Sequence, residues 1–292
     1  MTDETAPPRL LRSALFVPGD KPRAIAKAPS LRADALMLDL EDAVAPERKD
    51  VARAAAPGAI AAFRASGARA VLRIAAPDAP ELADDVKAAA AAKPDAVLVA
   101  KVDSAEALNA VRGALSDAGW SGPLWAMIET PAGLLSLEQT SWRAEGLGLD
   151  AVIAGTNDLA EALRLPDGPG RRAALVPHLY RLVLAARAAG ASVLDGVWNA
   201  YADEAGFLEE AQAGRAMGFD GKSLIHPSQV VPANAAFAPS ASEIAWAERV
   251  AAAFAKPENA GKGAVALDGR MVEIMHLNAA RALLDAAEKT KD

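Results

Sequence analysis

The chain lacks several things that would assign it to common functional classes. It has no cysteine, which excludes disulfide bonds, thiolate zinc sites and cysteine nucleophiles. No basic run stands out to neutralise nucleic-acid phosphates, and the formal net charge of -7 argues against such a partner. No apolar run is long enough to span a bilayer. The N-terminus lacks the pattern of a secretory signal, so we expect a cytoplasmic protein without a membrane partner.

Familiar catalytic motifs are also missing. The sequence contains no GxGxxG, no GxxxxGK, no GxSxG and no HExxH. The hydrophobic fraction of 52% and the charged fraction of 24% are ordinary for a folded globular protein. The function must therefore be read from the placement of individual polar residues.

Short apolar runs alternate with longer alanine-rich stretches along most of the chain. We predict strands at residues 14–17, 35–38, 70–74, 96–99, 124–128, 151–154, 192–194 and 223–225. Between them we predict helices that include residues 47–64, 105–117, 171–188 and 204–217. Eight strand-helix units favour an α/β fold of the TIM (β/α)8 barrel type over an open sheet.

The regular alternation ends after His226. We assign residues 1–238 to the barrel and residues 239–292 to a C-terminal helical extension. Within this extension we expect a helix near 242–254, an apolar piece at 264–267, a turn at Asp268-Gly269 and a helix near 277–289. The extension is small for an independent domain, so we expect it to pack on the barrel or on a neighbouring subunit.

Polar residues follow the predicted strands where each strand ends. The most informative case is residues 38–42, LDLED, directly after an apolar strand. Unpaired charges of this kind are too unfavourable to lie in a core. Active sites of (β/α)8 barrels lie at the carboxyl ends of the strands, so these residues mark the expected site.

Glu129 and Asp158 follow the fifth and sixth predicted strands and are the pair that we expect to bind a metal ion. Two carboxylates, together with waters and a chelating substrate, suit Mg²⁺ or Mn²⁺. Alternatively, Glu129 pairs with an arginine and Asp158 caps the next helix. Their occurrence on successive strands favours the metal site.

Other strand-end residues have two readings each. Glu41 and Asp42 could hold metal-bound waters or orient basic residues, or they could start a surface helix. Arg73 could bind a substrate carboxylate or enolate through its planar fork, or form an ion pair with residues 39–42.

Lys101 and His226 are more ambiguous. Lys101 could form a Schiff base, but a salt bridge fits the acidic surroundings better. His226 could act as an acid or base, although a hydrogen-bonded loop histidine is the commoner outcome.

Several stretches together resemble one family. They are residues 12–19 (RSALFVPG), 38–46, 128–133 (IETPAG), 155–159 (GTNDL), 218–222, 225–229 (IHPSQ), 237–240 and 268–272. The chain is similar to the citrate lyase beta-subunit-like family, which includes malyl-CoA and citramalyl-CoA lyases (HpcH/HpaI aldolase-like, pyruvate-kinase-like barrels).

The resemblance implies a Mg²⁺-dependent carbon–carbon lyase acting on a 3-hydroxy-3-carboxy acyl-CoA of the malyl-, citramalyl- or citryl-CoA type. It implies that Glu129 and Asp158 carry the metal and that Arg73 stabilises the enolate. In relatives with a C-terminal lid, an acidic residue from the neighbouring subunit completes the site, and the matching position here is Glu273. Arg12 and Lys21, expected near the barrel mouth, are candidate contacts for CoA phosphates.

Other activities remain open alongside this one. They are a 2-oxo-acid aldolase without CoA, an acyl-CoA thioesterase, a lyase-complex subunit that requires an acyl-carrier partner, and a non-catalytic metabolite-binding protein. The family usually has aspartate in place of Glu273 and an asparagine shortly after Arg73. We also expect a homo-oligomer, a trimer or hexamer.

Overall fold

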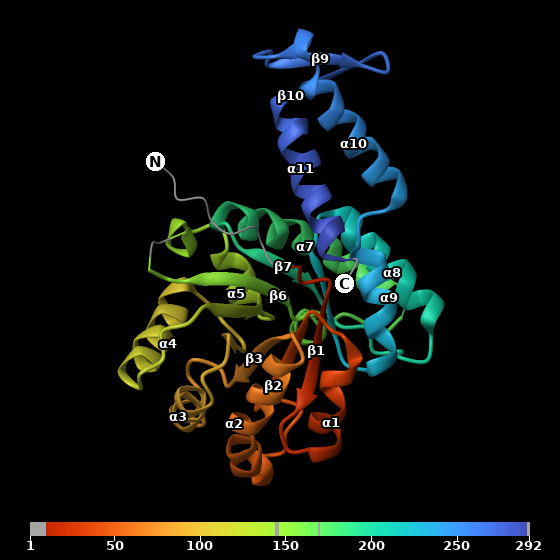
Figure 1. The fold of residues 1–292 in the computed structure, drawn as a ribbon. Coiled ribbons are helices and arrows are strands. Elements are labelled where there is room, and N and C mark those ends of the chain that lie inside the picture. Colours follow the sequence, from red (N-terminus) through yellow and green to blue (C-terminus); the bar gives the residue numbers. More distant parts are fainter. Residues whose placement is uncertain (1–9, 144–145, 169, 291–292) are drawn as a thin grey trace. The chain divides into compact units, whose positions relative to one another are not determined.

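The computed structural model describes residues 10–143, 146–168 and 170–290, and Figure 1 shows its elements along the chain. The first eight strands are β1 (Ser13–Pro18), β2 (Ala35–Asp39), β3 (Arg69–Ile74), β4 (Ala96–Val99), β5 (Leu124–Ile128), β6 (Leu149–Ala154), β7 (Ser192–Asp195) and β8 (Gly221–Leu224). The helices among and after them are α1 (Pro22–Lys27), α2 (Lys49–Ala65), α3 (Leu82–Ala92), α4 (Ala105–Asp117), α5 (Pro131–Ser136), α6 (Thr156–Ala162), α7 (Gly170–Ala189), α8 (Glu204–Met217) and α9 (Val230–Phe237).

These eight strands pair in sequence order and close into a parallel barrel, in which β1 is hydrogen-bonded to both β2 and β8. At the closure, Leu15 lies beside Leu36 of β2 and Leu224 of β8. Parallel neighbours require crossover connections, and the helical segments between the strands supply them. The predicted (β/α)8 barrel is therefore confirmed.

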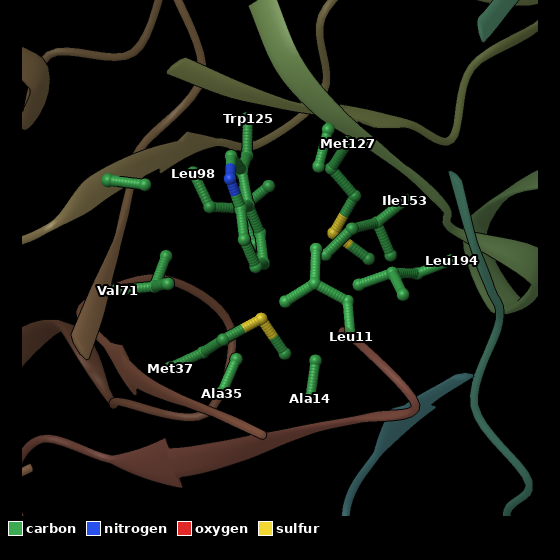
Figure 2. Close-up of a cluster of buried hydrophobic side chains, with 12 residues drawn as sticks. Leu11, Ala14, Ala35, Met37, Val71, Leu98, Trp125, Met127, Ile153 and Leu194 are labelled. Atoms are coloured by element: carbon green, nitrogen blue, oxygen red, sulfur yellow. The ribbon is translucent and has the colours of Figure 1, made fainter. Parts of the chain in front are cut away.

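A cluster of apolar side chains fills the interior of the barrel, as Figure 2 shows. It takes every second residue of a strand, for example Ala35 and Met37 of β2 or Trp125 and Met127 of β5. This spacing follows from the two-residue period of a strand, which points alternate side chains to the same face. The interior is thus a packed core rather than a channel, and ligands must bind at its ends.

Several helices, among them α2, α4 and α7, bury an apolar face. In α2, for instance, Ala52, Ala56, Ile60 and Phe63 are buried, at the three- and four-residue spacing of a helix that covers a core. Across the described residues, none of the helices combines the length and the apolar character needed to cross a membrane.

The eighth strand begins two residues earlier than the sequence indicated, at Gly221 instead of Ser223. The reason is Lys222, whose charge argues against a buried strand position. Its ammonium group reaches Asp195 and Glu210, at 3.1 and 2.7 Å, so it is buried as a paired charge.

The chain divides into two compact units, of which residues 11–236 form one and residue 237 onward belongs to the other. The C-terminal unit contains α10 (Ala241–Ala255), an antiparallel hairpin of β9 (Ala264–Leu267) and β10 (Arg270–Glu273), and α11 (Ile274–Lys289). The predicted turn joins the two strands, with φ of 52° at Asp268 and 74° at Gly269. Positive φ at both central residues is typical of the tight hairpin turn that Asp-Gly forms. β10 was not predicted.

Candidate active site

The alternation that builds the barrel core continues into a polar layer at the carboxyl ends of the strands. After Met37, Val71 and Met127, the next residues on the same face are Asp39, Arg73 and Glu129. On β6 the equivalent position after Ile153 is Gly155. The sequence period therefore places these charges side by side above the apolar core.

Arg73 is buried and bound to Asp39 through two parallel hydrogen bonds. Its Nε donates to Asp39 Oδ1 at 2.7 Å and its Nη2 donates to Oδ2 at 2.6 Å, while Nη1 lies 3.2 Å from Glu41 Oε2. The ring of Phe16 lies beneath the guanidinium at 4.6 Å. Burial opposes the charge, but Asp39 and Glu41 outweigh it and raise the pKa of Arg73. The ion pair that we predicted as one reading of Arg73 is thus present.

Glu129 is the most perturbed carboxyl group of the site. Its side chain is 2% exposed, and its Oε1 accepts a hydrogen bond of 2.8 Å from the backbone N–H of Lys101. Burial and the nearby charge of Asp158 raise the pKa of Glu129 to about 7, against partial compensation from Arg73. A carboxylate so poorly compensated favours the arrival of a further cation.

Asp158 lies in the first turn of α6, immediately after β6, and is partly exposed. Its Oδ2 is 3.7 Å from Lys101 Nζ. Burial raises the pKa of Asp158, Lys101 opposes this, and Asp42 adds to it. No side-chain cap hydrogen bond is present at the start of α6, so the alternative role of Asp158 as a cap has no support here.

Glu41 and Asp42 face Lys101 across the mouth of the barrel. The Nζ of Lys101 contacts Glu41 Oε1 and lies 3.2 Å from Asp42 Oδ1. The salt-bridge reading of Lys101 thus matches the geometry. Burial raises the pKa of Glu41, and Arg73 and Lys101 reduce the effect.

A cavity of about 280 Å³ lies at the carboxyl end of the barrel. Its lining includes the charged residues Asp39, Asp42, Arg73, Glu129 and Asp158. Apolar side chains complete the wall, among them Phe16, Ala43, Met127, Val197 and Ile225. A small pocket in which five charged residues converge within a partly apolar wall suits a small, polar, chelating ligand.

The charge balance of this acidic cluster fits a divalent cation. Among the described residues it comprises five carboxylates, of Asp39, Glu41, Asp42, Glu129 and Asp158, against the two cations of Arg73 and Lys101. The described residues contain no group of three or more His, Cys, Asp or Glu side chains arranged around a metal position. Two carboxylates with the remaining positions left to water and substrate is a common arrangement for Mg²⁺.

Gly155 keeps the space that Glu129 occupies. A Cβ atom at position 155 would come within 2.1 Å of Glu129 Cβ and 2.6 Å of its Oε2. Glycine is therefore a steric requirement for the observed Glu129 side chain.

Arg12 and Lys21 lie at opposite ends of β1. Arg12 precedes the strand, where its guanidinium donates to both oxygens of Asp34, at 2.7 and 2.9 Å. Our expectation that Arg12 lies near the barrel mouth is wrong, because it stands at the amino end of the strand. Lys21 follows the carboxyl end of β1 and is exposed, with its Nζ 2.9 Å from Asp20 Oδ2.

His226 and Glu273, two further residues singled out from the sequence, do not line this cavity. His226 follows β8, stacks on Tyr201 at 4.7 Å and has its Nδ1 2.8 Å from Ser228 Oγ. This is the hydrogen-bonded loop histidine that we considered the commoner outcome. Glu273 belongs to the C-terminal unit, where it precedes α11 and its backbone N–H donates to His276 Nδ1 at 3.0 Å.

A second, larger cavity of about 930 Å³ was not foreseen from the sequence. It lies beside α7 and α8 and is lined by Leu175, Val176, Ala213 and Met217. It shares Thr156, Asn157 and Val197 with the first cavity. A long ligand could therefore pass from one to the other.

The chain is similar to known proteins over nearly its whole length. The family described as HpcH/HpaI aldolase/citrate lyase matches residues 12–227. A (3S)-malyl-CoA thioesterase from Cereibacter sphaeroides is 42% identical over 277 residues, which cover 95% of this chain and 94% of the relative. The citrate lyase subunit beta of Escherichia coli is 33% identical over 288 residues, covering 96% of this chain and 94% of the relative.

Solved structures show the same fold. CitE from Mycobacterium tuberculosis, in complex with magnesium, acetoacetate and coenzyme A, has a TM-score of 0.78 at 31% identity, over 94% of this chain and 97% of that one. A citrate lyase beta subunit from the same organism, complexed with oxaloacetate and magnesium, has a TM-score of 0.68 at 29% identity, over 79% of this chain and 98% of that one.

Proposed function

The chain belongs to the HpcH/HpaI aldolase/citrate lyase family, and we propose that it is a Mg²⁺-dependent carbon–carbon lyase. Its substrate would be a 3-hydroxy-3-carboxy acyl-CoA of the malyl-, citramalyl- or citryl-CoA type. The observation that carries this proposal is the joint placement of Glu129, Asp158 and Arg73 around one small cavity. The magnesium and coenzyme A bound to the similar CitE structure support it.

The cavity favours a small oxo-acid fragment. Among the described lining residues Arg73 is the one cation, and Asp39 already occupies two of its donor positions. A second carboxylate on the fragment would thus find little compensation, which favours a malyl- or citramalyl-type substrate over a citryl-type one.

Cleavage requires the substrate hydroxyl to lose its proton as the bond between C2 and C3 breaks. The electron pair stays on C2 as a thioester enolate, which then takes up a proton. A bound Mg²⁺, held by Glu129 and Asp158, would supply a Lewis acid for the oxygens of the oxo acid.

The residues of the chain itself would provide proton acceptance and charge stabilisation. Asp42 lines the cavity and is suited to accept the hydroxyl proton. Burial opposes its charge, but hydrogen bonding with Glu41 and attraction to Lys101 keep the pKa of Asp42 below its usual value. The fixed charge of Arg73 would stabilise the enolate, because a preorganised cation costs no reorganisation during the reaction.

The second cavity supports a substrate longer than a free oxo acid. It adjoins the first at Asn157, whose side-chain amide exchanges two hydrogen bonds, of 2.7 and 3.2 Å, with that of Asn199. An acyl-CoA with its reacting end beside Glu129 could extend its arm past this amide pair. A lyase acting on a CoA thioester is therefore favoured over an aldolase acting on free acids.

The deciding experiment is turnover of malyl-CoA, citramalyl-CoA and citryl-CoA with Mg²⁺ or with EDTA. The 2-oxo acid and free thiol are measured separately, and free malate serves as the substrate without CoA. We expect Mg²⁺-dependent release of the 2-oxo acid from the thioester alone. Glu129→Gln should lower this rate by at least about 100-fold, since even groups that only support a metal ligand change affinity or activity 10–100-fold. Unchanged turnover would remove Glu129 from the reaction.

A thioesterase is the second candidate, favoured by the name of the 42% identical relative. It would release free thiol and malate from malyl-CoA without a 2-oxo acid. If both activities are absent while Mg²⁺ still binds, a lyase-complex subunit becomes the better assignment.

We also propose that the protein forms a homo-oligomer. In this assembly, Glu273 of a neighbouring copy would supply an acidic group to the site, and Lys21 would contact the phosphates of CoA.

A further inference from the structure

Lys101 has an unusual backbone at a critical position. It follows β4 and has a φ of 49°, in the left-handed region that a residue with a side chain seldom adopts. In this conformation its N–H donates to Glu129 Oε1 at 2.8 Å. A backbone conformation with an intrinsic energetic cost persists where the surroundings require it. Here the requirement is that the N–H of Lys101 points toward the buried carboxylate of Glu129.

The side chain of the same residue reaches the other carboxylates. Its Nζ contacts Glu41, lies 3.2 and 3.3 Å from the two oxygens of Asp42, and is 3.7 Å from Asp158 Oδ2. One residue therefore touches both proposed metal ligands, Glu129 through its backbone and Asp158 through its ammonium group. Lys101 does not line the cavity, so it acts through these carboxylates.

We propose that Lys101 is a positioning residue that holds Glu129 and Asp158 in their metal-binding arrangement before the ion arrives. This inference rests on the proposed Mg²⁺ site. Without Lys101 the four carboxylates of Glu41, Asp42, Glu129 and Asp158 would repel one another, and the partly exposed Asp158 would be free to turn toward solvent. A protonated lysine has donors and no acceptor, so it cannot itself replace a ligand.

The ammonium group of Lys101 could affect Mg²⁺ affinity in two opposite ways, so the direction of the measured change tests the proposal. As a cation near the site, Lys101 repels Mg²⁺, so removing it would strengthen binding if charge alone mattered. As a positioning group it keeps the ligands together, so removing it would weaken binding. The sign of the change distinguishes the two roles.

The experiment is a calorimetric titration of the full-length chain with Mg²⁺ alone. Glu129→Gln serves as a reporter that binding occurs at this site. Lys101→Met and Lys101→Gln remove the ammonium group while keeping an unbranched side chain, and either one suffices if the other does not fold. We expect both to weaken Mg²⁺ binding about tenfold, as for other groups that orient metal ligands, and Lys101→Arg to stay within about threefold.

The backbone contribution is tested by Lys101→Val. A β-branched residue is strongly disfavoured at positive φ, so the N–H should move away from Glu129 and binding should weaken further than in Lys101→Met.

Lys93, which ends α3 shortly before the same β-strand, offers a matched control. It precedes β4, is exposed, and has a φ of 50°. Lys93→Met and Lys93→Val therefore make the same chemical changes at the same backbone conformation, away from the acidic cluster. They should leave Mg²⁺ affinity unchanged.

The outcomes separate cleanly. Equal or tighter Mg²⁺ binding by Lys101→Met or Lys101→Gln would overturn the positioning role and leave the metal site intact. An equal loss in the Lys93 variants would also overturn it, because the effect would then be general. Absence of Mg²⁺ binding by the unaltered chain would overturn the proposed metal site together with this inference.

Discussion

Two charged clusters lie at strand ends of the same barrel, and they differ in charge balance. The β7–β8 cluster pairs Asp195 and Glu210 with Arg172 and Lys222, two anions with two cations. The acidic cluster at the ends of β2–β6 has five carboxylates against two cations. Buried charges that are balanced need no further partner, and removing one of them is strongly destabilising. An excess of one sign instead leaves a site that gains from binding the opposite charge.

The pKa shifts of the two clusters have opposite directions. Asp195 is fully buried, yet Lys222 and Arg172 outweigh that burial and lower its pKa. Glu129 is almost as buried, and burial together with Asp158 raises its pKa to about 7. The neighbours of each carboxylate, rather than its burial, thus separate a structural group from a candidate ligand.

The largest effect should come from breaking the balanced cluster. Asp195→Asn removes one of the two carboxylates that the ammonium of Lys222 and the guanidinium of Arg172 share, and leaves two cations with Glu210 alone in a buried region. We expect a loss of about 3–5 kcal/mol in the free energy of unfolding, measured by urea denaturation. A loss below about 1 kcal/mol would contradict the view that the balanced cluster, unlike the acidic cluster, is needed for stability.

In the absence of metal, removing the charge of Glu129 should raise the free energy of unfolding, whereas Asp195→Asn should lower it. Because its folded pKa of about 7 exceeds the ordinary value of 4.5, its contribution to stability is present below pH 4.5 and is lost as pH rises to 7. Above pH 7 the charged group then costs at most about 3 kcal/mol. Glu129→Gln keeps an acceptor for the Lys101 N–H and removes that cost.

Urea denaturation in EDTA across pH 4.5–8.5 checks this sign. We expect Glu129→Gln to be more stable than the unaltered chain above pH 7 and the two to converge near pH 4.5. Added Mg²⁺ should stabilise the unaltered chain alone. A variant that is less stable at every pH would contradict the picture of an uncompensated carboxylate.

Each of the two clusters has a glycine packed against its buried carboxylate, so alanine substitutions can test the two clusters in the same way. A Cβ at Gly155 would meet Glu129, and one at Gly214 would lie 2.8 Å from Asp195 Oδ2. Gly155→Ala and Gly214→Ala should each cost about 1–3 kcal/mol, as overpacking does. Titration with Mg²⁺ should show binding lost in Gly155→Ala and preserved in Gly214→Ala; loss in both would link the clusters.

The smallest effect should come from Asp158→Asn. Asp158 is partly exposed, so removing its charge should change metal-free stability by less than about 1 kcal/mol. Since its charge contributes to the raised pKa of Glu129, the stability loss with rising pH should be smaller in this variant and should level off at a lower pH. Denaturation midpoints at closely spaced pH values would reveal the shift, and an unchanged profile would mean that the two carboxylates do not interact.

Much of this arrangement could be predicted from local patterns. Apolar runs alternating with helical stretches indicated eight strands, and the polar residues at their ends indicated Asp39, Arg73 and Glu129. By contrast, the end of the barrel at which Arg12 lies was misjudged, although Arg12 precedes the predicted strand at residues 14–17 and so belongs to its amino end. The start of β8 was predicted two residues too late because Lys222 is charged. Its burial depends on Asp195 and Glu210, which lie elsewhere in the sequence.

The sequence alone determined which carboxylates stand at the carboxyl ends of strands, because the two-residue period of a strand and the position of its last apolar residue are local properties. Only the tertiary structure decided which of these charges are compensated. Lys101 meets Glu41 across 60 residues of sequence, and Arg172 meets Asp195 across 23. Such pairings arise when the barrel closes, and with them the difference between a neutral cluster and one with excess negative charge.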